Sequence, residues 1–193
     1  RAAGLVVAKA GTVAVTREEM LKVESEREQN CQIGKLMDLQ SLRDCVIRWK
    51  RDGLVVGFTN GCFDLIHPGH ISLLSRARKL CDRLVVGVNS DESVRRLKGE
   101  DRPLQNVRAR ATVLSAMSAV DGLIIFEDDT PLTLIRDLQP DLLIKGSDYS
   151  VSEVVGADLV KDHGGTVELV PFVKGESTTS IVNRIVSGDV SSE

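Results

Sequence analysis

Two histidines beside a glycine turn are the residues of this chain best suited to chemistry on phosphate. Residues 59–70 spell TNGCFDLIHPGH, which places His67 and His70 on either side of a Pro-Gly pair. An apolar run precedes the segment and a helical pattern follows it, so we expect the histidines near the N-terminus of a helix. Backbone amides and the helix dipole favour phosphate at such an end. Both imidazoles could therefore face one anion.

Other interpretations of the histidine pair stay open from sequence alone. Surface polarity or helix capping explains two histidines three residues apart about as well as a phosphate site does. A zinc site has too few ligands, because His163 is the only other histidine and Cys62 has no companion thiol at a usual spacing. The GxxxxGK[ST] and GxGxxG motifs are also missing after the first strand. We therefore name no metal ligand and expect neither a P-loop nor a dinucleotide-binding site.

The elements that position these residues follow an alternating pattern. From Leu54 onward, apolar runs of strand length alternate with longer amphipathic stretches. The runs are LVVGF, LVVGV, LIIF, LLIK and VELV, and helices are expected over 69–81, 106–119, 131–138, 152–163 and 179–187. This alternation predicts an α/β fold, a doubly wound parallel sheet with helices on both faces. Ligands of such sheets bind beyond the carboxyl ends of the strands, where the strand order changes direction.

The first 22 residues form a separate, shorter pattern. Residues 4–15 contain two β-branched runs, and Thr16 with Glu19 matches a capping box, which predicts a strand pair followed by a short helix. The chain begins with Arg1 rather than Met, so we expect a fragment or a processed product of something longer.

A linker joins this N-terminal extension to the main domain. Residues 23–35 are polar and highly charged, without an apolar period, as is typical of a linker. The main domain is expected over 36–193 and opens with an amphipathic helix that stops at Gly53. The apolar residues of this helix recur at helical spacing: Leu39, Leu42, Val46 and Trp49.

Composition and charge narrow the class of protein. The 193 residues are 42% hydrophobic and 27% charged, as in an ordinary globular protein, and the formal net charge is -3. That charge argues against the broad basic surface of a nucleic-acid binder and leaves room for a local phosphate pocket. The cysteines form no CxxC pair, which predicts free thiols in a reducing compartment: Cys31, Cys45, Cys62 and Cys81. Without an apolar run of membrane-spanning length or the layout of a secretory signal, we expect a cytoplasmic protein.

The segment GCFDLIHPGH resembles the HxGH signature of the cytidylyltransferase-like nucleotidyltransferases. Within that family, residues 36–187 are most similar to the heptose 1-phosphate adenylyltransferase domains of bifunctional ADP-heptose synthases. The matching segments are TNGCFD, HPGH, ARKLCDRLVVGVNSD, RLKGEDRPL, DTPLTLI, PDLLIKGSDY and GESTTSIV. Residues 1–22 resemble, less specifically, the C-terminal end of the ribokinase-like sugar kinase that precedes this domain in the fused enzymes. The resemblance implies a Rossmann-like fold, a homodimer and a fused kinase domain.

The same resemblance implies a reaction. AMP would pass from ATP to D-glycero-β-D-manno-heptose 1-phosphate, giving ADP-heptose for lipopolysaccharide core assembly and releasing pyrophosphate. Magnesium is implied by the triphosphate and would be held through phosphate oxygens and water. Such a transfer depends on positioning and charge stabilisation rather than on a covalent nucleophile. A cytidylyltransferase acting on a polyol or amino-alcohol phosphate, and a non-catalytic nucleotide sensor, remain alternatives.

The resemblance also assigns roles to individual residues. His67 and His70 would stabilise charge on the triphosphate, and Lys98 would reach it as the site closes, although a solvated lysine is the simpler interpretation. Asp64 would orient the turn or a histidine, or merely cap the turn. The nucleotide-binding residues that it implies are Gly61, Cys62, Phe63, Asp64, Arg110, Lys145, Gly146, Asp148, Ser177, Thr178 and Thr179.

Two segments depart from the family's pattern. Residues 106–108 read NVR where a proline and an acidic residue are common, beside the expected phosphate contact of Arg110. Residues 171–173 read PFV where many relatives have an arginine, which leaves Lys174 as the nearest cation. Near residues 145–148 a tight turn, and near 177–179 a helix cap, are the simpler alternatives to a binding role.

Overall fold

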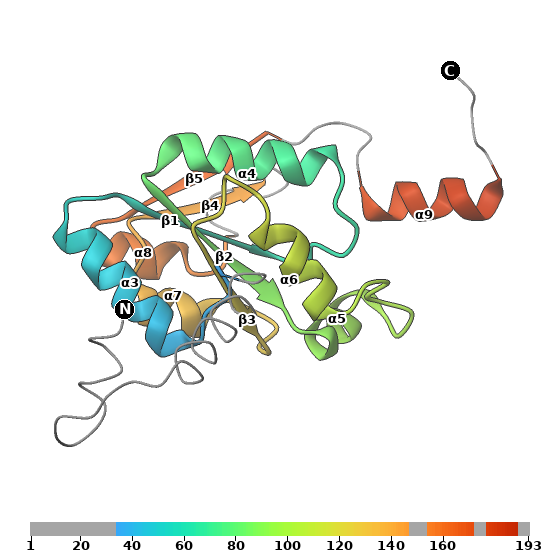
Figure 1. The fold of residues 1–193 in the computed structure, drawn as a ribbon, viewed down its shortest axis with the longest axis horizontal. Helices are drawn as coiled ribbons and strands as arrows, with labels where there is room; N and C mark the ends of the chain where they lie inside the picture. Colours follow the sequence, from blue (N-terminus) through green and yellow to red (C-terminus); the bar gives the residue numbers. More distant parts are fainter. Residues whose placement is uncertain (1–33, 147–153, 172–176, 189–193) are drawn as a thin grey trace, which may run out of the picture. The chain divides into compact units, whose positions relative to one another are not determined.

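The computed structural model describes residues 34–146, 154–171 and 177–188 (Figure 1). The chain divides into two compact units, Arg1–Gly34 and Lys35–Glu193, and the second unit is described by itself. The strand pair and short helix expected in the N-terminal extension, most of the linker, and Asp148 lie outside the described residues.

A five-stranded parallel sheet forms the centre of the second unit. The strands are β1 (Val56–Gly61), β2 (Arg83–Asn89), β3 (Gly122–Phe126), β4 (Leu142–Gly146) and β5 (Thr166–Val170). Their order is β3-β2-β1-β4-β5, so the chain builds outward from β1 on one side and then crosses to the other. The order reverses between β1 and β4, which makes that gap the expected ligand position. The predicted doubly wound parallel sheet is confirmed.

Seven helices accompany the sheet in the described part of the chain. They are α3 (Leu39–Arg51), α4 (Pro68–Leu80), α5 (Asp91–Lys98), α6 (Val107–Ser115), α7 (Leu132–Leu138), α8 (Ala157–Asp162) and α9 (Thr178–Ser187). Helix α6 ends four residues before its predicted end at 119, and the described part of α8 begins later than predicted. Helix α5 is not predicted by any pattern in the sequence, because this short polar helix buries only Ser93 and Val94 and so has no apolar period.

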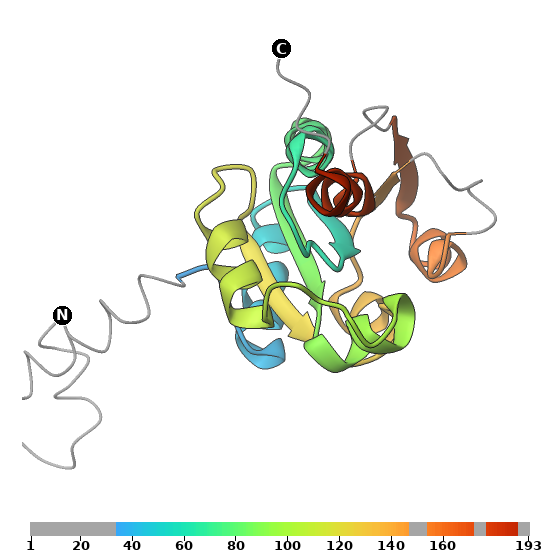
Figure 2. The same cartoon turned by 90° about the vertical axis from the view of Figure 1, so that its right-hand side faces the viewer.

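The helices cover both faces of the sheet (Figures 1 and 2). One apolar core joins the sheet to α3, α7 and α8, and the other joins it to α4 and α6. Strand β2 contributes to both cores, because Val85 faces one while Leu84 and Val86 face the other. All three side chains are fully buried. This packing on both sides explains why the strands are continuous apolar runs.

Three aspartates form side-chain hydrogen bonds to the backbone at the amino ends of the strands. Each aspartate is the residue immediately before a strand. Its carboxylate accepts a hydrogen bond from a backbone amide at, or just before, the start of the neighbouring strand. The pairs are Asp82 with Val55, Asp121 with Leu84, and Asp141 with Val56, each at 2.9 Å. Basic side chains partly balance these carboxylates: Lys50 lies 3.0 Å from Asp141, and Arg78 lies 3.2 Å from Asp121.

The outer edge of β3 is covered by the chain that leads into α3. Met37 donates its amide hydrogen to the Leu123 carbonyl at 2.9 Å, and Leu123 donates to the Lys35 carbonyl at 2.7 Å. This bridge occupies the outer edge of β3 at Leu123, where another chain could otherwise pair. The described helices include none that is both long and apolar enough to cross a membrane.

Candidate active site

A cavity of about 540 Å³ lies beyond the carboxyl ends of β1 and β4, where the strand order reverses. The predicted site residues that line it are Gly61, Cys62, Phe63, Asp64, His70, Lys98, Lys145, Gly146, Ser177, Thr178 and Thr179. His67 and Arg110 do not line this cavity. Residues more than a hundred positions apart in the sequence therefore meet beyond the carboxyl ends of the strands, as expected for a parallel sheet.

His67 caps the helix that carries the histidine pair. Its Nδ1 atom accepts a hydrogen bond from the Gly69 amide at 3.1 Å, which closes the first turn of α4. The capping interpretation is thus confirmed for this residue. The ring is buried, and its centroid lies 3.8 Å from that of His70. The cap holds the two imidazoles in contact, with His70 on the side of the cavity.

His70 is kept neutral by its surroundings. Burial, followed by the charge of His67, lowers the pKa of His70 to about 4, while the Leu65 backbone opposes the shift. Its Nδ1 atom is buried without a hydrogen-bond partner among the described residues. Phe63 packs beside the ring at a centroid distance of 5.1 Å.

The lowered pKa of His70 makes stability depend on pH. Its ordinary value is 6.5 and its folded value about 4, so between these limits the unfolded chain binds more protons. Stability should therefore fall as pH is lowered from about 6.5 towards 4. Urea unfolding at pH 7 and pH 5 should show a smaller loss for His70→Gln than for the original chain. The exposed His163→Gln is the control, and equal losses in all three proteins would refute the assignment.

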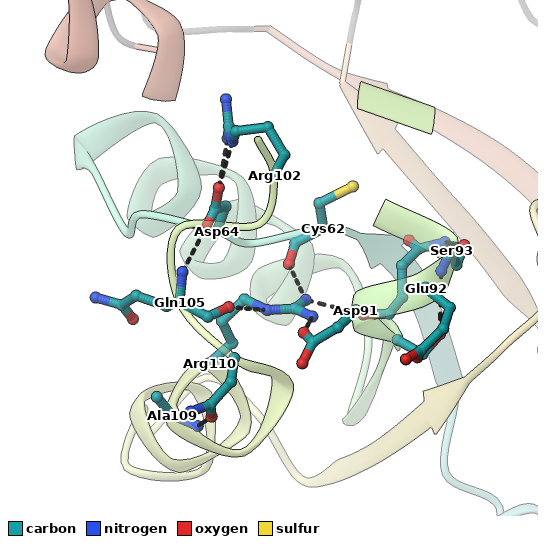
Figure 3. Close-up of polar contacts among 12 residues, drawn as sticks. Cys62, Asp64, Asp91, Glu92, Ser93, Arg102, Gln105, Ala109 and Arg110 are labelled. Carbon is teal, nitrogen blue, oxygen red and sulfur yellow. Dashed lines mark hydrogen bonds and ion pairs between the residues drawn. The ribbon is translucent and has the colours of Figure 1, made fainter. Parts of the chain in front are cut away.

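Asp64 organises a distant segment of the cavity wall. Its carboxylate, 2% exposed, accepts hydrogen bonds from the Leu104 amide at 2.8 Å and the Gln105 amide at 2.9 Å. Arg102 forms an ion pair with the same carboxylate at 2.6 Å (Figure 3). Asp64 therefore holds the segment that follows Lys98, whereas the sequence-based expectation was an interaction with its own turn or with a histidine. Its oxygens are fully engaged and do not offer a ligand to a metal.

Arg110 lies in the wall of the site rather than at its surface. The guanidinium is fully buried and points at carbonyl groups from three segments (Figure 3). It donates to the Cys62 carbonyl at 2.5 Å, the Asn89 carbonyl at 2.9 Å and the Gln105 carbonyl at 3.0 Å, and it pairs with Asp91 at 2.7 Å. These contacts join three segments of the protein, and the phosphate contact expected of Arg110 stays a prediction.

Two lysines give the cavity its uncompensated positive charge. Lys98 ends α5, and Lys145 lies near the end of β4. Neither forms an ion pair with a carboxylate among the described residues, whereas the charge of Arg102 is balanced by Asp64. Burial lowers the pKa of Lys145 to about 8, which still leaves most of it protonated at neutral pH.

Cys62 lines the cavity, and its surroundings favour the neutral thiol over the thiolate. Burial raises the pKa of Cys62, and the nearby charges of Lys98 and Arg110 only partly oppose that shift. A thiol is a poor nucleophile compared with a thiolate. The structure thus agrees with a lining role and gives no support to covalent catalysis by Cys62.

The start of α9 closes the cavity on another side. Ser177 and Ser180 form a capping box, so the capping interpretation of this segment is confirmed. The Thr178 hydroxyl donates to the Leu65 carbonyl at 3.5 Å, which brings the start of α9 to the segment that precedes His67. Two helix N-termini therefore lie at one side of the cavity.

Several lining residues are absent from the sequence-based site: Thr59, Asn60, Leu73, Leu97, Arg102, Asp129, Thr130, Pro131, Val154 and Val155. Thr59 and Asn60 end β1, so a stricter use of the strand-end rule would have found them. Asp129 and Thr130 follow β3 in the same manner. Arg102 carries no local signal, because its place depends on the buried carboxylate of Asp64.

The geometry agrees with the comparisons to known proteins. The Cytidylyltransferase-like family profile matches residues 58–187, and the chain belongs to this family. The bifunctional protein HldE of Caulobacter sp. (strain K31) is 50% identical over 184 residues, which are 95% of this chain and 38% of that protein. HldE of Hyphomonas neptunium is 52% identical over 187 residues, 97% of this chain and again 38% of the relative. The chain thus spans little more than a third of these curated relatives.

Solved structures give the same fold. A lipopolysaccharide core biosynthesis protein from Thermoplasma volcanium matches with a TM-score of 0.51 and 29% identity, covering 64% of this chain and all of that one. A pantoate-β-alanine ligase from Francisella tularensis has the same TM-score at 18% identity, covers 79% of this chain and 77% of its own, and shows the fold alone. The predicted family and the Rossmann-like α/β fold are confirmed.

Proposed function

We propose that this chain is an adenylyltransferase that transfers AMP from ATP to D-glycero-β-D-manno-heptose 1-phosphate for lipopolysaccharide core synthesis. The observation that carries the proposal is the contact between His67 and His70 at the start of α4, with His70 lining the cavity at the sheet's switch point. Identity of about 50% to HldE proteins supports the choice of nucleotide and acceptor. The share of the relatives covered, 38%, supports a fused kinase domain in the full-length protein.

The chemistry assigned to the chain's own residues is binding and charge stabilisation. An oxygen of the sugar phosphate attacks the α-phosphorus of ATP, the bond to the β-phosphate oxygen breaks, and pyrophosphate leaves with the electron pair. His70 and Lys98, which line the cavity, stabilise the charge on the triphosphate, and the family resemblance assigns the same role to His67. The start of α9, with Thr178 and Thr179, offers amides and hydroxyls to the same phosphates.

The remaining residues shape the nucleotide pocket. Gly61, at the end of β1, forms the wall with Cys62 and Phe63, and Gly146 extends it at the end of β4. The family resemblance alone assigns Asp148 to the nucleotide. Magnesium would arrive on the triphosphate, because Asp64 is occupied by Arg102 and two amides and the described residues hold no cluster of three acidic, histidine or cysteine ligands. We further propose a cytoplasmic homodimer, whose mass in solution light scattering would measure.

The test is pyrophosphate release by the purified chain with magnesium, the heptose 1-phosphate, and either ATP or CTP. Release with ATP that is abolished by His67→Ala, and kept by the exposed His163→Ala, is the expected result. Release with CTP alone would move the assignment to the cytidylyltransferases. A folded chain that binds ATP without any turnover would instead be a nucleotide sensor or would act on another acceptor.

A further inference from the structure

The gap between β1 and β4 holds a polar pair to which the family resemblance gives no joint role. The pairing of these strands ends with Gly57 opposite Leu142 and Phe58 opposite Leu143. Two positions beyond the last pair, Asn60 and Lys145 face each other across the switch point. The Lys145 ammonium donates a hydrogen bond to the Asn60 side-chain oxygen, and both residues line the cavity.

The environment of this pair is adapted to an oxygen anion. The partner of Lys145 is a neutral amide, so its positive charge is held in place without being cancelled. A half-buried ammonium whose charge no carboxylate cancels among the described residues retains donor capacity that an anionic ligand can use.

The proposed reaction needs two anions on different walls of the cavity. The triphosphate is matched by the side where α4 and α9 begin, which the Thr178 to Leu65 hydrogen bond joins. In-line displacement places the attacking oxygen opposite the departing pyrophosphate. A cation that binds the attacking group must therefore come from another element, and Lys145 on β4 meets that requirement.

We infer that Asn60 and Lys145 bind the phosphate group of the acceptor, with Lys145 as the contact and Asn60 as the residue that positions it. The inference rests on the proposed adenylyl transfer. A phosphate monoester has its second pKa near 6, so at neutral pH it arrives largely as a dianion and attacks without giving up a proton. The site therefore needs a positive charge at the acceptor phosphate and no general base.

Steady-state kinetics with variable acceptor and variable ATP tests the inference. Lys145→Gln should raise KM for the sugar phosphate about 10- to 100-fold, the usual range for loss of a hydrogen bond to a charged group, and change KM for ATP far less. Lys161→Gln, which removes an exposed lysine of α8, is the matched control. A rise in KM for ATP with an unchanged acceptor KM would place Lys145 in the triphosphate site and overturn the inference.

Substitutions of Asn60 separate positioning from folding. Asn60→Asp keeps an oxygen beside Lys145 but cancels its charge, so it should weaken acceptor binding more than Asn60→Ala does. Thermal unfolding shows whether each variant is folded, and calorimetry with α,β-methylene-ATP in place measures acceptor binding without turnover. Equal acceptor affinity for Asn60→Asp and the original chain would contradict the role.

One further measurement separates this inference from the proposed function. In protein labelled with ¹³C at lysine Cε, the Lys145 signal is the one lost in Lys145→Gln, and inorganic phosphate should raise its titration midpoint. Failure of the original chain to make ADP-heptose would reject the proposed function alone. A Lys145 midpoint that inorganic phosphate leaves unchanged would reject the anion site itself.

Discussion

Replacing His70 by alanine should lower kcat for nucleotidyl transfer about 100- to 1000-fold, the usual loss for one well-placed donor to a developing negative charge. His70 is the histidine of the pair that lines the cavity, and its Nδ1 atom has no described partner in the protein. The neutral ring can donate one hydrogen bond and accept another. Single-turnover assays at saturating ATP would measure the chemical step directly.

The matched control for this substitution is His163→Ala, which removes an exposed histidine outside the cavity. Its kcat should stay unchanged. His70→Asn, which retains a donor of smaller size, should recover part of the lost rate. If His70→Ala raised KM for ATP while kcat stayed the same, the ring would bind substrate and transition state equally, and its catalytic role would be refuted.

Arg110→Met should destabilise the fold by about 3 to 5 kcal/mol, because it leaves the partners of a buried charge without compensation. The side chain is fully buried and pairs with Asp91 while donating to three carbonyl groups. Methionine fills much of the volume but supplies none of these hydrogen bonds. Urea unfolding followed by circular dichroism would measure the loss.

Arg108→Met is the control for this prediction, since Arg108 is exposed on the same helix two residues earlier. It should change the free energy of unfolding by less than about 0.5 kcal/mol. Arg110→Lys should be intermediate, because one ammonium group cannot reach all the carbonyls that the planar guanidinium spans. Unchanged stability of Arg110→Met, together with a large rise in KM for ATP, would show a phosphate contact instead.

Much of the fold follows from local pattern. The apolar runs LVVGV and LIIF lie within β2 and β3, and uninterrupted runs of this kind are typical of strands covered on both faces. Helix α4 is predictable from Pro68 at its start and from apolar residues at helical spacing. Helix α5 escapes detection because its stability depends on the Ser90 cap and on packing of Val94 against the sheet, neither of which produces a period in the sequence.

The candidate site was predictable where it depends on strand ends and not where it depends on tertiary contacts. Gly61 and Lys145 follow apolar runs, so their position could be inferred from the parallel topology. The direction in which the Arg110 side chain points could not be inferred from the sequence. It depends on carbonyl groups at the ends of β1 and β2 and on Asp91. Arg102 enters the site only through the carboxylate of Asp64, almost forty residues earlier.

The aspartates at the amino ends of the strands lie far from the cavity, and this distance limits their electrostatic repulsion of an approaching anion. Asp121 and Asp141 lie at the opposite end of the sheet from Lys145, and β4 between them spans five residues, or about 17 Å at roughly 3.3 Å per residue. At physiological ionic strength the screening length is about 8 Å, so the repulsion between these carboxylates and an anion in the cavity is largely screened. Lys50 and Arg78 also balance Asp141 and Asp121, so a chain with a net charge of -3 can attract a sugar phosphate to the lysines of its cavity.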